Sequence, residues 1–359
     1  MELGITGLPL TGKTTLFNAL TGQSVATGGY TSVKEAHRAV VKVPDHRLDV
    51  LAELLQREKK VPADVRYIDV AGIVKGTRKD TSSALLGALK TVDALIHVVR
   101  AFRSGTVPEP VGGINPERDI ADLDLELALS DLEQAERRLE RIEKELRSGK
   151  KEAEHEYEVV KRCRDALSAE KPLRELDLSD EEERLIRGFQ FLTRKPMIIV
   201  INVGEDELDR VGEIGSRSAP FAERPHVEVA VLSAEIEMEV AQLDEADRPA
   251  FLEELGIKES AVHRLIRTSY HLLDLISFFT VVSDEVRAWT ARRGTLAPQA
   301  AGVVHTDMER GFIRAEVVHY DDFVTSGGMA QAKDKGVLRL EGKNYEVKDG
   351  DILTIRFGV

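Results

Sequence analysis

The residues Gly7 to Thr14 read G-x-x-x-x-G-K-T and directly follow the apolar stretch Leu3-Gly4-Ile5. This pattern is typical of a strand, a phosphate-binding loop and the start of a helix, rather than of an ordinary glycine turn. Backbone N–H groups around the glycines and the positive end of the helix favour phosphate, and Lys13 adds a cation. The motif therefore predicts that the chain binds a nucleoside triphosphate. The predicted nucleotide-binding residues of this segment are Gly7, Pro9, Leu10, Thr11, Gly12, Lys13, Thr14 and Thr15.

Length and composition narrow the class of protein. A chain of 359 residues with 42% hydrophobic content can bury two or three domain cores. Its single cysteine, Cys163, cannot form an internal disulfide, and we find neither a leader peptide nor an apolar run long enough to cross a bilayer. The formal charge of -13 argues against general nucleic-acid binding, so we expect no DNA partner and only local RNA contacts. These features predict a cytoplasmic protein.

Short apolar segments with β-branched residues alternate with helical stretches. The segments lie at 65–70, 94–99, 197–201 and 227–232. His97, inside the second of them, reads as a packed core residue. Alternation of this kind predicts a doubly wound, mostly parallel α/β sheet.

The character of the chain changes between residues 116 and 194. Apolar residues from Leu125 to Leu146 follow an a/d heptad pattern, which predicts a long amphipathic helix. The sequence Ser148-Gly149-Lys150 breaks this helix, and a second amphipathic helix ends at Pro172. The simplest interpretation is an antiparallel helical hairpin, although the heptads could also pair two chains. Ser179 and Glu182 form a predicted capping box for a further helix that extends to Leu192.

From residue 277 onward the pattern shifts to short strands, which predicts a small α+β domain. We therefore divide the chain into a nucleotide-binding domain at 1–115 and 195–276, a helical insertion at 116–194 and a C-terminal domain at 277–359.

Two further segments complete the predicted nucleotide site. Asp69-Val70-Ala71-Gly72 is a D-x-x-G arrangement at a strand end, where Asp69 would hold Mg²⁺ and the Gly72 amide would contact the γ-phosphate. A later strand ends in Asn202-Val203-Gly204-Glu205, at the place where guanine-nucleotide switches carry N-K-x-D. Glu in place of Asp should disturb the pair of hydrogen bonds that guanine donates, and adenine offers no such donor pair. Ser233-Ala234-Glu235 occupies the position of the loop that touches the base.

Together these motifs resemble those of the YchF family, also called Obg-like ATPases. The likeness is carried by D-V-A-G-I-V-K-G from Asp69 to Gly76, by Asn202-x-x-Glu205 and by E-V-R-A-W-T from Glu285 to Thr290, and it extends over nearly the whole chain. The resemblance implies a P-loop G domain that is interrupted by a helical coiled-coil hairpin and followed by a ubiquitin-like TGS domain. It also implies a preference for ATP over GTP and an association with ribosomal RNA or proteins.

Several positions depart from the family pattern. Switch II after Gly76 lacks the family's glycines, and Gly29 to Ser32 matches the first switch only roughly, so both Thr31 and Ser32 are candidate Mg²⁺ ligands beside Thr14 and Asp69. Ile73 stands where Ras-type proteins place a water-orienting glutamine, and the resemblance implies an apolar residue there too. The family often has a histidine in the loop before the hairpin, which the loop at 107–110 lacks. The candidate catalytic residues are Lys13, Gly72 and Glu109.

Two functions remain open at this point. The first is a switch that binds and slowly hydrolyses ATP, or GTP, with Mg²⁺ and acts on the ribosome. The second is an adaptor that binds nucleotide without hydrolysing it and works through its hairpin and TGS domain.

Overall fold

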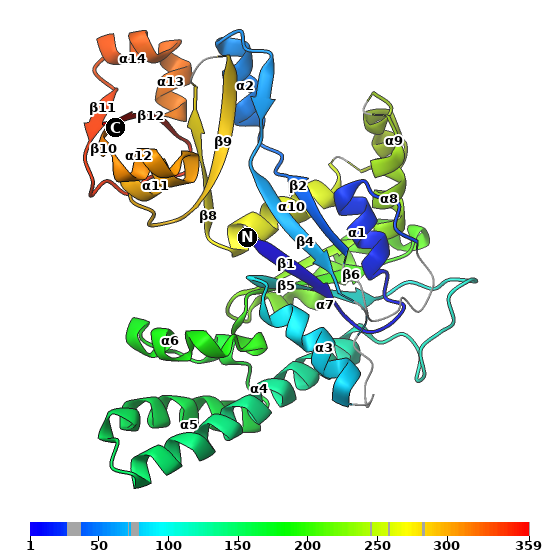
Figure 1. The fold of residues 1–359 in the computed structure, drawn as a ribbon. Helices are drawn as coiled ribbons and strands as arrows, with labels where there is room; N and C mark the ends of the chain where they lie inside the picture. The colour runs from blue at the N-terminus through cyan, green and yellow to red at the C-terminus, as the bar shows by residue number, and fades with distance from the viewer. Residues whose placement is uncertain are drawn as a thin grey trace. The chain divides into compact units, whose positions relative to one another are not determined.

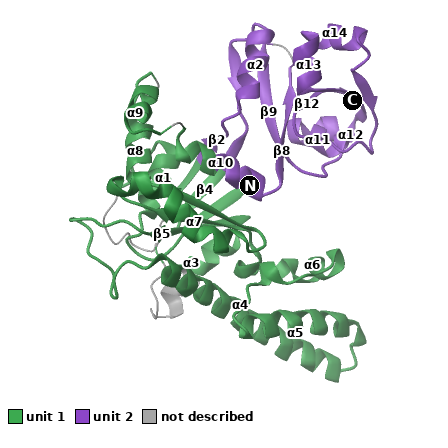
Figure 2. Cartoon of the chain, turned by 180° about the vertical axis from the view of Figure 1, so that it is seen from behind, with its two compact units in different colours: residues 1–39, 66–265 green, residues 40–65, 266–359 purple. Residues whose placement is uncertain are grey.

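A computed structural model describes residues 1–26, 37–70, 72, 79–244, 246–257, 259–281 and 284–358, with the backbone alone at 79–84. The chain forms two compact units (Figure 2). The first comprises residues 1–39 and 66–265, and the second comprises residues 40–65 and 266–359.

The first unit is built on a six-stranded sheet. Four neighbouring pairs of its strands are parallel. Every residue of the two central strands, Ala94–Arg100 and Met197–Asn202, is buried, as expected for a sheet that is covered on both faces. This confirms the predicted doubly wound α/β fold. In spatial order the strands are β2 (His37–Lys42), β4 (Asp64–Asp69), β1 (Glu2–Thr6), β5 (Ala94–Arg100), β6 (Met197–Asn202) and β7 (Val227–Leu232).

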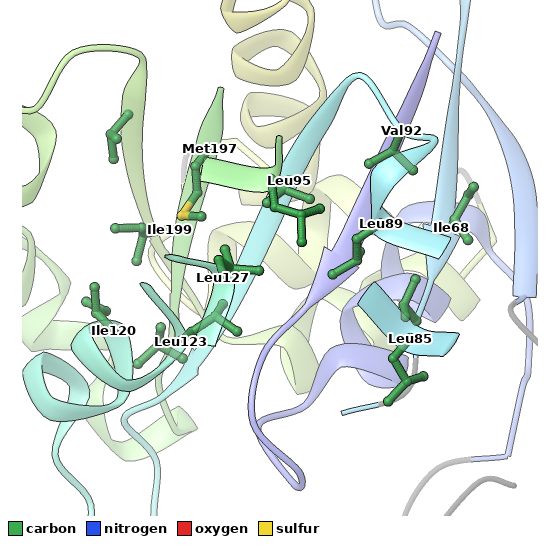
Figure 3. Close-up of a cluster of buried hydrophobic side chains, with 14 of the residues drawn as sticks. Ile68, Leu85, Leu89, Val92, Leu95, Ile120, Leu123, Leu127, Met197 and Ile199 are labelled. Carbon is green, nitrogen blue, oxygen red and sulfur yellow. The ribbon is translucent and has the colours of Figure 1, made fainter. Parts of the chain in front are cut away.

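Helices cover this sheet on both sides. On one face, side chains of α3 and α4 meet those of the strands in a continuous apolar layer, in which Leu89, Leu123 and Ile199 are buried (Figure 3). On the other face α1 and α8 pack together. The helices of this unit are α1 (Lys13–Thr21), α3 (Lys79–Lys90), α4 (Pro116–Arg147), α5 (Glu154–Ser168), α6 (Asp180–Ile186), α7 (Val211–Ala222), α8 (Ala234–Gln242), α9 (Arg248–Glu254) and α10 (Ala261–Leu272), the last of which continues into the second unit. Among the described residues, no helix is long and apolar enough to span a membrane.

The predicted helical hairpin is formed by α4 and α5, which lie side by side (Figure 1). Apolar residues of both helices, including Leu139, Ile142 and Val160, share one buried cluster, so the heptad face is covered within the chain. The capping box at Ser179 is present and starts α6.

Two predicted helix ends in this region are wrong. The second helix stops at Ser168 rather than Pro172, because the left-handed backbone of Glu170 (φ 55°) interrupts it. Helix α6 stops at Ile186 rather than Leu192, since Gln190 is also left-handed and the chain continues in short 3₁₀ turns.

The second unit contains its own six-stranded sheet. Helix α11 packs on β9 and β10, and α2 also packs on β9. The strands in spatial order are β11 (Arg339–Glu341), β10 (Phe312–His319), β12 (Asp351–Phe357), β8 (Leu275–Thr280), β9 (Glu285–Arg292) and β3 (Lys59–Val61). The helices are α2 (His46–Leu54), α11 (Ala297–Val304), α12 (Thr306–Arg310), α13 (Tyr320–Ser326) and α14 (Met329–Asp334).

The compact units divide the chain differently from the predicted domains. We placed residues 40–65 in the nucleotide-binding domain, but they group with the C-terminal unit. The reason is that β3 adds to the C-terminal sheet beside β9, while Arg47 binds Asp349 at 2.7 Å and lies over the ring of Phe279. The helical insertion groups with the first unit.

Candidate functional site

The phosphate loop connects β1 to α1 and depends on glycine at two positions. Gly7 has φ +143°, and a Cβ atom there would lie 2.4 Å from the carbonyl oxygen of Val98. Gly12 has φ +91°, and its Cβ would lie 2.3 Å from Nδ2 of Asn202. Any side chain at either position would be strained and would collide with a neighbouring segment. The glycines of the motif are therefore fixed by close packing as well as by backbone conformation.

Lys13 lies inside this loop and is only 7% exposed. Its Nζ donates a hydrogen bond to the carbonyl oxygen of Leu8 at 2.5 Å. Burial lowers the pKa of Lys13 to about 8, although the charge of Asp69 opposes the shift. An anion bound beside Nζ would raise this pKa and favour the protonated form, so the position suits a phosphate oxygen.

Gly72 of the D-x-x-G motif lies against the same loop. A Cβ atom on Gly72 would lie 3.0 Å from Nζ of Lys13 and 3.0 Å from both the backbone nitrogen and Cα of Pro9. The structure thus brings together the two predicted phosphate-contacting segments, which are separated by about sixty residues in the sequence.

Thr14 and Asp69 meet beside the loop. The hydroxyl of Thr14 donates to Oδ2 of Asp69 at 2.9 Å, and Oδ1 of Asp69 is buried with no hydrogen-bond partner in the described part of the chain. Burial raises the pKa of Asp69, whereas the bond from Thr14 and the charge of Lys13 lower it. Two hard oxygen donors, one with free acceptor capacity, fit Mg²⁺ held together with phosphates and water. Thr31 and Ser32 lie outside the described residues.

Asn202 joins the phosphate loop to the predicted base-reading loop. Its side chain is buried, with Nδ2 donating to the carbonyl oxygen of Thr11 at 3.0 Å and Oδ1 accepting from the backbone N–H of Ala234 at 2.9 Å. We predicted that the segment from Asn202 to Glu205 lies at the place where related switches bind the base. In the structure the side chain of Asn202 connects two loops.

The remaining base-side residues lie around this amide. Val203 is buried, with its N–H bonded to Leu232, and Ser233 is a buried cap that accepts from Ile236 N–H at the start of α8. Glu205 is exposed in the 3₁₀ turn after β6, and Glu235 is exposed on the first turn of α8. Thr15 is half-buried on the first turn of α1.

Phe102 is a site residue that the sequence interpretation missed. A Cβ atom built on Gly12 would lie 3.9 Å from the ring of Phe102. A Cβ atom built on Gly204 would lie 3.7 Å from the Cβ of Phe102. Arg100 stacks over this ring at 4.6 Å and donates to the Phe102 carbonyl. An aromatic residue two positions after a buried strand carries no distinctive pattern, so only its packing places it between the phosphate loop and the base side.

Glu109 is exposed on the loop that follows β5. Arg100 fixes this loop by donating to the carbonyl oxygens of Val107 and Pro108, but the side chain of Glu109 points to solvent rather than into a buried site. The structure therefore does not bring Glu109 into the cluster formed by Lys13, Thr14, Asp69 and Asn202.

Comparison with known families gives two matches. Residues 275–358 match the YchF-GTPase_C family, described as a protein of unknown function. Residues 2–146 match the MMR_HSR1 family, described as a 50S ribosome-binding GTPase.

Curated relatives match over the full length. The chain is 43% identical over 364 residues to the "Ribosome-binding ATPase YchF" of Bacillus subtilis (strain 168), with all of both chains covered. It is 42% identical to the protein of the same name from Pasteurella multocida (strain Pm70), covering 99% of that protein. Among solved structures, the Schizosaccharomyces pombe YchF GTPase superposes with a TM-score of 0.86 at 31% identity, covering 99% of this chain and 97% of that one.

Proposed function

The chain belongs to the YchF family of P-loop nucleoside triphosphatases, and from that premise we propose that it is an ATP-dependent switch that associates with the ribosome. The observation that carries the proposal is the convergence of Lys13, Thr14, Asp69 and Gly72 on one glycine-rich loop, with Asn202 clamping that loop to the base side. A cytoplasmic location follows from a ribosomal partner.

Each residue at the phosphate end has a distinct task. The amides of the loop and of Gly72 bind phosphate oxygens, and Lys13 neutralises charge that develops on the γ-phosphate. Thr14 and Asp69 would hold Mg²⁺. The ion would supply neutralisation of phosphate charge.

The base end favours ATP over GTP only weakly. Guanine donates two hydrogen bonds that a carboxylate at the position of Glu205 would have to accept, and the longer glutamate side chain is exposed and unanchored there. The ring of Phe102, near Gly12 and Gly204, offers an apolar face to a base. Such a face would contact adenine and guanine equally well. ATP preference therefore rests on weak discrimination, so GTP also binds.

Slow hydrolysis follows from the groups near the γ-phosphate position. Lys13 is mostly protonated at neutral pH, we assign Asp69 to Mg²⁺ rather than to water, and the apolar side chain of Ile73 cannot orient water. Turnover then depends on charge stabilisation and on the partner to which the switch binds.

Co-sedimentation with ribosomes tests the switch. Purified protein should pellet with ribosomes to different extents with ATP, with ADP and without nucleotide, while Lys13→Ala should pellet equally in all three conditions. Equal pelleting of the unmodified protein in all conditions would contradict a nucleotide-dependent switch.

A nucleotide-binding adaptor without hydrolysis is the second candidate, and the altered switch II after Gly76 and the missing histidine in the loop at 107–110 favour it. Multiple turnovers of ATP that disappear in Lys13→Ala, in protein that is still folded, would exclude the adaptor.

A further inference from the structure

Two polar side chains lie side by side in the apolar layer behind the phosphate loop. Thr6 of β1 and His97 of β5 are register partners, and Ile199 of β6 is the next residue in the same row. Residues in register on parallel strands point to the same face of a sheet. Leu95 and Val99, two positions before and after His97, belong to the apolar layer that α3 and α4 cover, and Leu95 and Ile199 are both visible in Figure 3.

Both side chains are completely buried, with relative exposures of 0%. Within the described residues, neither ring nitrogen of His97 nor the hydroxyl of Thr6 has a hydrogen-bond partner. Burial, together with the charges of Lys13 and Arg174, lowers the pKa of His97 to about 3. The ring is therefore neutral near pH 7, with one N–H donor and one acceptor nitrogen.

Adjacent unpartnered polar groups in an apolar layer need an explanation, because leucine and valine would fill the same space without loss of hydrogen bonds. Buried water typically occupies such places when two or more polar groups converge on it. The Thr6 hydroxyl and one ring nitrogen of His97 supply two, because the two ring nitrogens point in different directions.

The pair is in contact with the phosphate loop. Thr6 is the residue directly before Gly7, and a Cβ atom on Gly7 would lie 3.4 Å from Cδ2 of His97. Gly7 has a positive φ, so His97 lies against the residue at which the left-handed backbone of the loop begins.

We propose that Thr6 and His97 form a buried water site behind the phosphate loop and that His97 is a positioning residue, which holds Gly7 and the loop in the geometry that binds nucleotide phosphates. The inference rests on the proposed function, because it assigns these residues a role in nucleotide binding. His97 does not touch nucleotide and takes no part in proton transfer.

The test compares folding stability with nucleotide affinity in three variants. Thr6→Val and His97→Leu remove polar atoms at nearly constant volume, and His97→Gln keeps one donor and one acceptor. We expect the denaturation midpoints of the first two variants to equal or exceed that of the unmodified protein. Their dissociation constants for Mg-ATP should rise about two- to tenfold, as expected for loss of a hydrogen bond. His97→Gln should recover part of the affinity.

Ile199→Val is the matched control, since it changes packing at the third position of the same row without removing a polar group. It should lower the denaturation midpoint and leave the dissociation constant unchanged. A structure that resolves water should also show one within about 3 Å of Thr6 Oγ1 and of a His97 ring nitrogen.

The outcomes distinguish the positioning role of His97 from the proposed function. If the unmodified protein binds Mg-ATP and Thr6→Val and His97→Leu bind it equally well, the positioning role is overturned and the proposed function stands. If both variants unfold more readily and bind normally once folded, His97 is merely structural. Unmodified protein that binds neither nucleotide would remove the proposed function and the inference together.

Discussion

The phosphate end and the base end of the nucleotide site are built in different ways. At the phosphate end, the functional side chains of Lys13 and Asp69 are 7% and 6% exposed and are held by neighbours in the first unit. At the base end, the carboxylates of Glu205 and Glu235 are exposed. The buried side chain of Asn202 connects the two ends. Under the proposed function, this difference places phosphate affinity in the packed interior and leaves the choice of base to a few surface groups that are easily changed.

The largest effect should come from Lys13→Ala, which removes the cation of the phosphate end. We expect affinity for Mg-ATP and Mg-GTP to fall together by about 100-fold, the range for losing a charged hydrogen-bond donor to phosphate. Calorimetric titration measures both constants, and circular dichroism checks the fold. Retained affinity would mean that the backbone of the loop binds the phosphates without the lysine side chain.

Asn202→Ala should affect both ends at once. It leaves the carbonyl of Thr11 and the N–H of Ala234 without their partner in a buried place, which should reduce the free energy of unfolding by about 2 kcal/mol. Affinity for both nucleotides should also fall.

Asn115→Ala is a matched control for Asn202→Ala, because Asn115 only caps α4 through a bond to Arg118 N–H. It should cost about 1 kcal/mol and leave affinity unchanged. Chemical denaturation and titration of both variants make the comparison. Equal effects of the two substitutions on affinity would show that Asn202 is an ordinary structural residue.

The pH dependence of binding should report on the phosphate end alone. Burial lowers the pKa of Lys13 from 10.5 to about 8 in the free protein, and phosphate binding needs the protonated form. The dissociation constant for Mg-ATP should therefore rise about tenfold between pH 7 and pH 9. For folding the sign is opposite: the unfolded chain keeps this proton up to its higher pKa, so the Lys13 contribution to stability increases from about pH 8 to 10.5.

Lys13→Arg is the control for this pH dependence, because arginine stays charged throughout the range. Titrations of both proteins at several pH values should give a flat profile for the variant. A flat profile for the unmodified protein would place the lysine in a more solvated setting than its burial indicates.

The smallest effect should come from Glu205→Asp at the base end. Shortening one exposed carboxylate should change the ratio of ATP to GTP affinity by about threefold in favour of GTP, with little change in stability. Competition between the two nucleotides for one protein sample measures this ratio directly. A shift as large as that of Lys13→Ala would show that the base end is as tightly built as the phosphate end.

The sequence by itself determined the features that local chemistry requires. A phosphate loop needs glycine where the backbone turns left-handed, so Gly7 and Gly12 identified the loop, and the lysine and threonine that follow were identified with it. Apolar strands between helices determined the parallel sheet, and the heptad pattern together with the capping box at Ser179 determined the helical insertion. Each of these patterns is contained in a short stretch of chain.

Tertiary structure decided what depends on residues that are distant in sequence. The grouping of residues 40–65 with the C-terminal unit follows from the pairing of β3 with β9, and no pattern within the segment specifies that partner. The clamp at Asn202, the position of Phe102 and the row of Thr6 and His97 exist only because separate strands end, or lie in register, side by side. The physical reason is that hydrogen bonds and packing act through space over a few ångströms, whereas periodicity and motif spacing record only the order of residues along the chain.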